Sequence, residues 1–381
     1  TASEVNDTIF TSCANTCDET VTLATPLSKT FNTENDIGES DNIITIIGHT
    51  YETGDAVQYS NESGTNVSGL TSGTTYYVIR VSRDTIKLAT SLSNANSGTA
   101  ITISPASEDA GETQALKTLS EKRYESHGVI DTGTVPAKIL EDMTSSCMGL
   151  VYYSGGKWGM KVGEYLTPSV TLGDDDLRDN ISVTTRNSRR DSFNAVKGVF
   201  SDPDQKYQPT DFPPITSSTF QTEDAGEQIF SDVELPFTTS SAMAQRIAKM
   251  ILYRNREQIN LNFPAKLTGF NVEVGDTVLV NNTRLGFSNK PFEVASWSFA
   301  TTKEGQLGID LSLRETSSSV YDWSAEETAI ISNNTTLPDP FSPSAPTLSV
   351  SDALTTFNQE AITVLQATVS STDSFVDQFE V

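Results

Sequence analysis

Acidic side chains are the most abundant residues here that could carry out chemistry, with 50 Asp and Glu against 25 Lys and Arg. Any two carboxylates could be posed as the acid and base of a glycosidase. The run Asp174-Asp175-Asp176 suggests a calcium site, but the spacing of an EF-hand, with its Gly and its final Glu, does not follow it. Adjacent acidic side chains also point in different directions. We therefore interpret this run as a solvated turn.

The histidines and cysteines do not form the pattern of a catalytic or metal site. His49 and His127 are the two histidines and lie far apart in sequence, which disfavours a catalytic triad or a multi-His site. Cys13 and Cys17 lie four residues apart, and Cys147 is remote in sequence. A structural zinc site takes four ligands, so Cys13 and Cys17 would need two more, and nothing nearby in the sequence supplies them. No GxSxG, HExxH or Walker motif is present, nor a GxGxxG after a strand. We predict reduced, buried cysteines and a protein that is not an enzyme, with no catalytic residue, cofactor or metal.

One basic cluster stands out in this acidic chain, formed by Arg186, Arg189 and Arg190. These arginines could contact an acidic neighbouring subunit or a lipid phosphate. They could also pair within the chain, with Asp174–Asp176 and Asp179. We favour pairing within the chain or a subunit contact, and we name the three arginines as a candidate subunit-contact cluster.

The overall charge and hydropathy exclude several classes of protein. The net charge of −25 repels phosphate backbones, so a surface that binds duplex DNA is disfavoured. No apolar run approaches the roughly 20 residues that span a bilayer, and no signal peptide opens the chain. The sequence begins at Thr1 and ends at Val381 within a predicted helix, so we expect a fragment of a longer polypeptide.

The patterning predicts a mainly β, multi-domain protein with α+β elements. Residues 29–118 are rich in Ser, Thr, Asn and Gly, and short strand runs alternate with turns, which predicts a small all-β module. This module is inserted between residues 1–28 and 119–166, which together form a discontinuous α+β domain. Helices are predicted there at 3–17 and 135–148, and a hairpin with a Gly-Gly turn at 150–162.

The second half of the sequence predicts a β-rich domain followed by an extension. Residues 167–324 contain several strands and a helix at 239–257. A Pro-rich linker is predicted at 325–351, and an amphipathic helix at 352–381 that starts a fibre or coiled coil. The candidate oligomer interface on that helix follows a 3-4-4 spacing and consists of Leu354, Phe357, Ala361 and Leu365.

Several stretches of this sequence, taken in order, carry a resemblance to one known family. They are TSCANTCDETVTL, EKRYESHGVIDTGTVPAKILEDMTSSCMGLVYYSGGKWGMKVGEY, SRRDSFNAVKGVFSDPDQKYQPTDFPPI, SSAMAQRIAKMILYRNREQINLNFPAKLTGFNVEVGDTVLVNN, FEVASWSF and VYDW. They resemble the central tail-tip hub protein of long non-contractile-tailed phages, the lambda tip attachment protein J family. The resemblance covers roughly residues 1–28 and 119–324, and residues 29–118 depart from it as an insertion.

The resemblance implies a structural role with a defined set of partners. Members of this family are homotrimers whose β-barrel-like domains close the distal end of the tail tube. They contact distal tail and tail-tube proteins, hold the end of the tape-measure protein, and anchor the central fibre or receptor-binding protein that meets a host surface receptor. DNA passes through them into the host without specific binding. The implied location is the virion, at the tail tip (the baseplate hub), after assembly in the cytoplasm of the bacterial host.

The charge of the chain agrees with such a passage, because an acidic wall repels DNA whereas a basic wall would retain it. A second hypothesis is that residues 29–118 form an outward-facing carbohydrate- or receptor-binding adhesin module, and the two roles are compatible. A third, an enzyme that acts on cell-wall glycans, has the least support.

Overall fold

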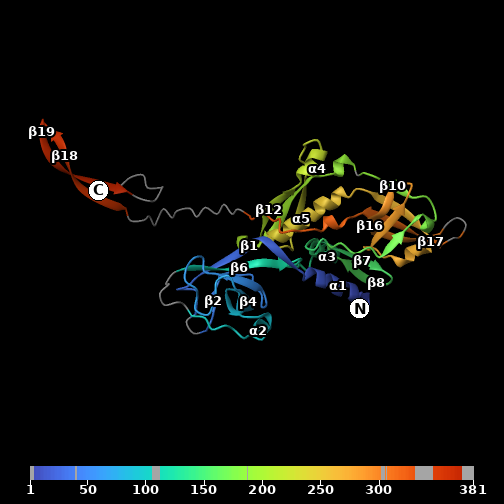
Figure 1. The fold of residues 1–381 in the computed structure, drawn as a ribbon, viewed down its shortest axis with the longest axis horizontal. Coiled ribbons are helices and arrows are strands. Elements are labelled where there is room, and N and C mark those ends of the chain that lie inside the picture. The colour runs from blue at the N-terminus through green and yellow to red at the C-terminus, as the bar shows by residue number, and fades with distance from the viewer. Residues whose placement is uncertain are drawn as a thin grey trace. The chain divides into compact units, whose positions relative to one another are not determined.

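The protein is mainly β, with 42% of residues in strands and 20% helical, which confirms the predicted fold class. The computed structural model describes residues 4–38, 41–104, 112–186, 188–301, 305, 307–330 and 346–370 (Figure 1). The chain forms two compact units, Thr1–Ile330 and Ile331–Val381, which are treated separately below.

The first sheet of unit 1 has the strand order β1-β6-β3-β4-β5-β2. Its strands are β1 (Thr20–Asn32), β2 (Ile44–Thr45), β3 (Ala56–Ser60), β4 (Thr75–Arg80), β5 (Thr85–Ala89) and β6 (Thr113–Lys122), with the short helix α2 (Leu92–Asn96) beside β4 and β5. Alternate residues of these strands point inward, and Tyr59, Val78 and Ile86 are fully buried. The hydrophobic core of this sheet contains only residues between Phe31 and Leu116, so the inserted segment has a core of its own.

Strands β1 and β6 continue from this sheet toward the rest of unit 1. At the start of this ladder Val21 pairs with Glu121. The register then shifts between Thr22 and Leu27. The backbone N–H groups of Ala24 and Thr25 in this bulge donate to the Glu327 carboxylate, which replaces the lost ladder bonds.

The second sheet of unit 1 has three strands and is covered by the longest helix. Its order is β12-β11-β13, with β11 (Ala195–Asp202) antiparallel to β12 (Gln208–Thr216) and parallel to β13 (Phe230–Leu235). A β-carbon at Gly198 would clash with the carbonyl oxygen of Val233, so glycine permits this parallel pair to approach. Figure 1 shows α5 beside β12.

Helix α5 (Ser241–Arg256) is the helix predicted at 239–257. The Ser240 side chain caps its start by accepting a hydrogen bond from the Met243 N–H, and Arg254 and Arg256 lie in its last turn. Its apolar face is fully buried at Ile247 and Leu252.

The remaining elements around α5 share its core. They are α1 (Asp7–Cys17), α3 (Pro136–Ser145), β7 (Leu150–Ser154), β8 (Lys157–Lys161) and α4 (Ser218–Glu223). The helices expected at 3–17 and 135–148 correspond to α1 and α3, and β7 and β8 pair across the predicted Gly-Gly turn. One cluster joins Cys13, Tyr124 and Cys147 to Phe200 and Ile247. The core therefore continues across the expected domain boundary at 166/167.

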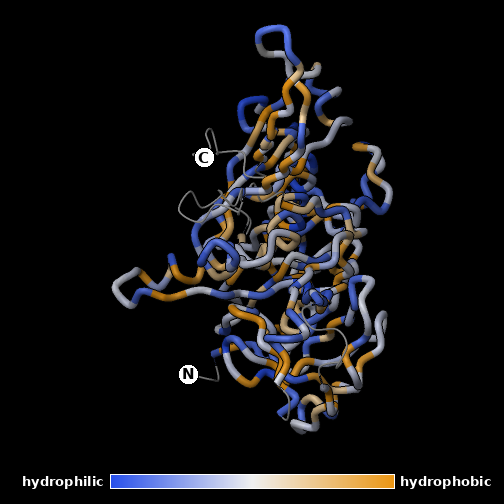
Figure 2. Tube along the Cα trace, turned by 90° about the vertical axis from the view of Figure 1, so that its left-hand side faces the viewer, coloured by the Kyte–Doolittle hydropathy of each residue, from blue (hydrophilic) through white to orange (hydrophobic). Residues whose placement is uncertain are grey.

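The third sheet of unit 1 has six strands in the order β10-β14-β17-β16-β15-β9. They are β9 (Val170–Leu172), β10 (Ser182–Thr184), β14 (Asn260–Ala265), β15 (Thr277–Asn282), β16 (Phe287–Thr301) and β17 (Leu307–Glu315). Its core is separate and contains Phe263, Phe292 and Leu311, all fully buried. Figure 2 shows apolar residues along the strands and hydrophilic residues at many loop tips. Short 3-10 turns complete the unit: η2 (Asp174–Asp176), η3 (Arg189–Asp191), η4 (Pro203–Gln205), η5 (Leu267–Asn271) and η6 (Ser318–Val320).

The predicted C-terminal helix is wrong over its described part. Unit 2 instead contains an antiparallel hairpin of β18 (Thr347–Phe357) and β19 (Glu360–Ser370). Asn358 and Gln359 form its two-residue turn with φ of 50° and 68°, the left-handed conformation that such turns require. β-Branched Thr, Val and Ile residues are frequent in both strands, and such residues favour strand over helix. The remainder of the predicted helix, 371–381, lies outside the described residues.

The predicted linker at 325–351 also requires correction at both ends. At its start, Glu327 is buried and Ile330 packs against the core around α5, so 325–330 belong to unit 1. At its end, β18 already begins at Thr347. Residues 331–345 lie outside the described residues.

Candidate functional site

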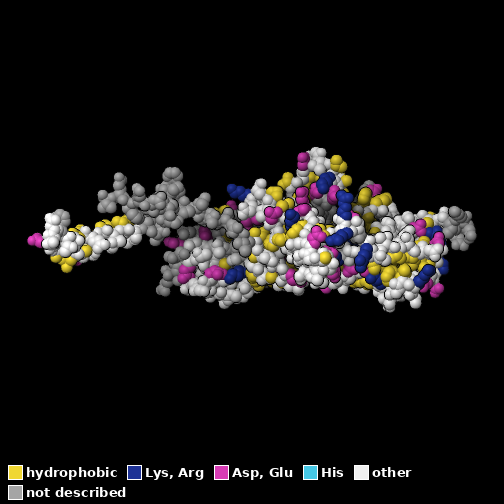
Figure 3. All heavy atoms as spheres, turned by 90° about the horizontal axis from the view of Figure 1, so that it is seen from above, with side chains coloured by type: hydrophobic (Ala, Val, Ile, Leu, Met, Phe, Trp, Pro, Cys, Tyr) yellow, Lys and Arg dark blue, Asp and Glu magenta, His cyan; other side chains and the backbone are white. Residues whose placement is uncertain are grey.

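The C-terminal hairpin presents an exposed apolar face. Residues that pair directly across an antiparallel ladder lie on the same face, and the pairs Leu348–Val369, Val350–Ala367, Asp352–Leu365, Leu354–Thr363 and Thr356–Ala361 define this hairpin face. Leu354 and Leu365 are 79% and 77% exposed. Figure 3 shows hydrophobic side chains along the hairpin.

This face contains three of the four residues of the candidate oligomer interface. Leu354, Ala361 and Leu365 lie on it through strand register, not through the helical spacing that suggested them. Phe357 is the last residue of β18, and its side chain is outside the described part. The segment 347–370 carries only two charged residues, Asp352 and Glu360.

The basic cluster lies on the surface, around η3. Arg189 pairs with Glu227, with 3.1 Å between Nη2 and Oε2, and both side chains are more than half exposed. The expected intrachain partners are engaged elsewhere, since the Asp174 carboxylate accepts a hydrogen bond from Asn282 and Asp179 accepts one from Asn180. Among the described residues, Arg186 and Arg190 form no ion pair, so both remain available to another molecule.

The acidic run Asp174–Asp176 is a turn, as predicted. It forms η2, in which Asp174 and Asp175 are exposed. The Asp176 carboxylate accepts a hydrogen bond from the Gly173 N–H at 2.8 Å, which closes the turn.

The three cysteines are reduced and lie near one another. Burial raises the pKa of Cys17 to about 11 and that of Cys147 to about 12. The Cys13 thiol donates to the carbonyl of Met160, and the Cys147 thiol donates to that of Thr144. Thiols with raised pKa values are weak nucleophiles at neutral pH. Within the described residues, no group of three or more His, Cys, Asp and Glu side chains is arranged to hold a metal ion.

A buried ionic cluster joins β8 and α5 to β16 of the third sheet. Glu293 Oε1 lies 3.2 Å from Lys161 Nζ and 3.1 Å from Arg254 Nη2, and the Lys161 and Glu293 side chains are 9% and 7% exposed. Lys161 also donates to the carbonyl of Gly275 at 2.7 Å. Burial lowers the pKa of Lys161, and Glu293 opposes this shift. The cluster therefore fastens two cores of unit 1 to each other.

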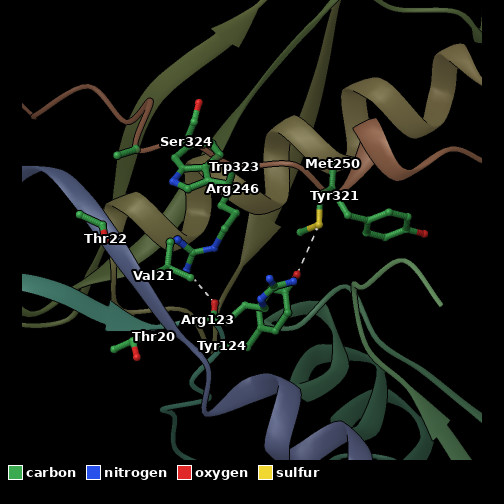
Figure 4. A pocket seen from close by; sticks show the side chains of 11 residues that line it. Thr20, Val21, Thr22, Arg123, Tyr124, Arg246, Met250, Tyr321, Trp323 and Ser324 are labelled. Carbon is green, nitrogen blue, oxygen red and sulfur yellow. Dashed lines mark hydrogen bonds between the residues drawn. The ribbon is translucent and has the colours of Figure 1, made fainter. Parts of the chain in front are cut away.

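A cavity of unit 1 lies between β1, α5 and the segment 321–325, and we call it the arginine cavity. It has a volume of about 470 Å³. It is lined by Thr20, Val21, Thr22, Arg123, Tyr124, Arg246, Met250, Tyr321, Trp323, Ser324 and Ala325. Figure 4 shows Arg246 extending from α5 toward β1, with Trp323 beside it.

Arg246 is held from one side by the backbone and by one carboxylate. Its Nη2 donates to the carbonyl of Arg123 at 2.6 Å and to Glu121 Oε1 at 3.1 Å (Figure 4 shows the Arg123 bond). Glu121 also accepts from the Ser240 hydroxyl at 2.5 Å. Burial raises the pKa of Glu121, while Arg246 and Ser240 lower it.

Sequence reasoning missed the arginine cavity. Its lining comes from four segments, with as many as 121 positions between consecutive ones, and no local motif links them. The signal available in the sequence was the VYDW run at 320–323, whose aromatic residues cover α5.

Comparison with known protein families gives one match over part of the chain. Residues 137–297, less than half of the chain, match the family described as putative phage tail protein. No curated protein sequence matches the chain. Over these residues the chain is similar to phage tail proteins. The match does not name the tip attachment protein J family.

Solved structures of tail proteins and a related particle also resemble the chain. The tail protein from Neisseria meningitidis MC58 is 12% identical, with 77% of this chain and 98% of that chain covered and a TM-score of 0.39. A chain in the virion of a native gene transfer agent particle is 10% identical, with 78% of this chain and 86% of that chain covered and a TM-score of 0.38. The 43 kDa tail protein of prophage MuSo2 from Shewanella oneidensis is 11% identical, with 76% of this chain and 93% of that chain covered and a TM-score of 0.33. Likeness at this level does not establish a shared fold. Among the described residues, no helix is long and apolar enough to cross a membrane.

Proposed function

We propose that this protein is the central tail-tip hub of a long non-contractile-tailed phage, of the tip attachment protein J family. It acts by shape and assembly, without catalysis. The observation that carries the proposal is the match of residues 137–297 to a phage tail protein family, together with the resemblance of the flanking segments to tip hubs. In this role it closes the distal tail tube, contacts tail-tube and tape-measure proteins, anchors the central fibre or receptor-binding protein, and lets DNA pass.

The acidic composition supports the passage of DNA. A subunit with a net charge of −25, repeated around an axis, gives a lumen that repels phosphate. In the view of Figure 3, Lys and Arg are interspersed with Asp and Glu over unit 1. The acidic surplus of the passage is therefore expected on the surfaces that line the axis.

The hub is a homotrimer, and the hairpin face is one of its contacts. A two-stranded hairpin is at best marginally stable alone in water. The outer edges of β18 and β19 pair with no other strand among the described residues, and no Lys or Pro interrupts either strand. Low charge on the hairpin lets copies approach although the whole chain is strongly acidic. The arginine cluster at Arg186, Arg189 and Arg190 is a further subunit contact, because Arg186 and Arg190 form no ion pair within the described part of the chain.

Sedimentation and imaging test the hub assignment. The full chain should sediment at three times its 41.2 kDa mass at micromolar concentration, and electron microscopy should show a three-fold particle with an axial opening. A particle that remains monomeric at high concentration, or a closed axis with basic walls, would contradict the proposal.

The inserted module supports a second, compatible role as an outward-facing adhesin that binds a carbohydrate or receptor. The specific observation is that residues 31–116 have a separate core and expose Ile47 at 87%. Binding of the full chain to a glycan array, lost after substitution of exposed residues in this module, would support it. If the chain binds none of the glycans on the array, the module has no carbohydrate-binding role.

A further inference from the structure

The arginine cavity presents cationic side chains and no carboxylate. Its lining includes Arg123 and Arg246 and no Asp or Glu. Each arginine forms one ion pair outside the lining, Arg123 with Glu19 and Arg246 with Glu121, and each ion pair is formed through Nη2. The other guanidinium nitrogens can donate to an anionic occupant.

The cavity also contains hydrogen-bond donors without acceptors. Arg246 is 4% exposed, and its Nε and Nη1 have no partner among the described residues. The same holds for Arg123 Nε and for Trp323 Nε1. Leaving a buried donor unsatisfied is unfavourable, so four such groups around one cavity indicate a missing acceptor.

The other lining residues of the cavity are apolar, aromatic or hydroxyl-bearing, the last being Thr20, Thr22 and Ser324. Val21, Met250 and Tyr321 line it, and the Tyr124 hydroxyl is engaged, since it donates to the carbonyl of Gly163 at 2.6 Å. A cavity of about 470 Å³ is large enough for a small organic ligand. The arrangement thus combines cationic donors at one side with an apolar surface at the other.

We infer that the arginine cavity binds a carboxylate attached to an apolar group, as at the C-terminus of a peptide chain. The carboxylate accepts hydrogen bonds from the arginines and from the Trp323 indole, because guanidinium groups favour planar acceptors. The apolar group contacts Met250 and Tyr321. This site is independent of the hub assignment and of the hairpin face.

Trp323 covers the site and moves when the ligand enters. Its ring lies 5.9 Å from the Arg246 guanidinium carbon and 5.6 Å from Lys249 Nζ, and it belongs to an irregular segment without helix or strand. The unsatisfied nitrogens are shielded by their surroundings in the unliganded protein, so a ligand reaches them by displacing this ring. Trp323 is therefore a direct reporter of binding.

The experiment uses the full chain labelled with 5-fluorotryptophan at its three tryptophans, Trp158, Trp297 and Trp323. N-acetyl-phenylalanine should shift the Trp323 fluorine resonance saturably and leave the other two unchanged. N-acetyl-phenylalanine amide, which lacks only the carboxylate, should cause no such shift. Acetate should shift the same resonance only at higher concentration, because it lacks the apolar group.

Two arginine variants test the donors. Arg246→Gln and Arg123→Gln should each weaken N-acetyl-phenylalanine binding by about tenfold, as loss of a charge-assisted hydrogen bond predicts. Arg123 is less buried and pairs with exposed Glu19, so its variant remains informative if Arg246→Gln does not fold. Arg189→Gln, at the surface, is the matched control and should bind normally.

Three results would overturn the inference. The amide could bind as tightly as the acid, Arg123→Gln could bind as well as the native chain, or inorganic phosphate could saturate the Trp323 shift at lower concentration than N-acetyl-phenylalanine. Acetate binding as tightly as N-acetyl-phenylalanine would overturn the apolar part of the site.

Discussion

The inserted module and the C-terminal hairpin are both β structures rich in Ser and Thr, yet they differ in what holds them. The module encloses a core in which Tyr59, Ile86 and Leu116 are almost completely buried. The hairpin leaves Leu354 and Leu365 mostly exposed. A similar composition therefore gives a self-sufficient fold where six strands enclose a core, and an incomplete one where two strands have no cover.

The largest expected effect is on the ionic cluster of unit 1, which lies outside the inserted module and is buried like the module's core. Glu293→Gln leaves the buried Lys161 and the partly buried Arg254 without their shared carboxylate, and we expect a loss of about 3–5 kcal/mol in the free energy of unfolding. Urea denaturation of the full chain measures it. Glu141→Gln is the control, because Glu141 pairs with Lys138 at the surface, and its loss should cost less than about 1 kcal/mol. Equal losses in the two variants would contradict this reading of the cluster.

The next effect concerns the core of the inserted module. Leu116→Ala removes a fully buried side chain and should destabilise the module by about 2–5 kcal/mol. Leu92→Ala, at a residue that is 48% exposed, should change stability far less. Circular dichroism during thermal unfolding compares them. If the two variants melt alike, the module does not depend on a core of its own.

A smaller effect is expected from acid. The Arg256 side chain, with help from Asn194, lowers the pKa of Asp224 below its usual value near 3.8. This pair stabilises the fold above that usual value, and the contribution is lost as pH falls through the lowered pKa. Asp224→Asn should therefore reduce stability at pH 7 by about 1 kcal/mol or less and flatten its decline below about pH 4. Asp232→Asn, at an exposed pair with Lys197, is the control for the urea titration at each pH.

The smallest effect on unfolding is expected at the hairpin, where association should change instead. Leu354→Ser with Leu365→Ser should leave the unfolding of unit 1 unchanged, because neither residue belongs to its cores. The dissociation constant of the trimer should rise, so that the trimer dissociates at concentrations at which the native trimer stays intact. Sedimentation velocity measures this change. Thr355→Ser with Thr368→Ser, on the opposite face, should leave the trimer intact. If this double variant destabilises unit 1, or leaves the trimer intact, the hairpin face is not the trimer contact.

Local patterns predicted the elements that local interactions specify. The helix at α5 followed from an apolar stripe containing Met243 and Ile247, and the β7–β8 hairpin followed from Gly155-Gly156, both of which adopt positive φ. The C-terminal hairpin was missed because Leu354, Ala361 and Leu365 fit a helical spacing as well as one face of a hairpin. The Asn358-Gln359 turn distinguishes the two, and its left-handed backbone is only weakly encoded by those residues.

The sequence by itself determined the β-rich class, the acidic charge, the separate texture of the inserted module and the positions of several helices, because propensity, capping and periodicity act between near neighbours. Only the tertiary structure decided that one core crosses residue 166, that Glu293 joins Lys161 to Arg254, and that Arg123, Arg246 and Trp323 surround one cavity. These features depend on contacts between segments far apart in the chain, where packing and desolvation, not local spacing, select which side chains meet.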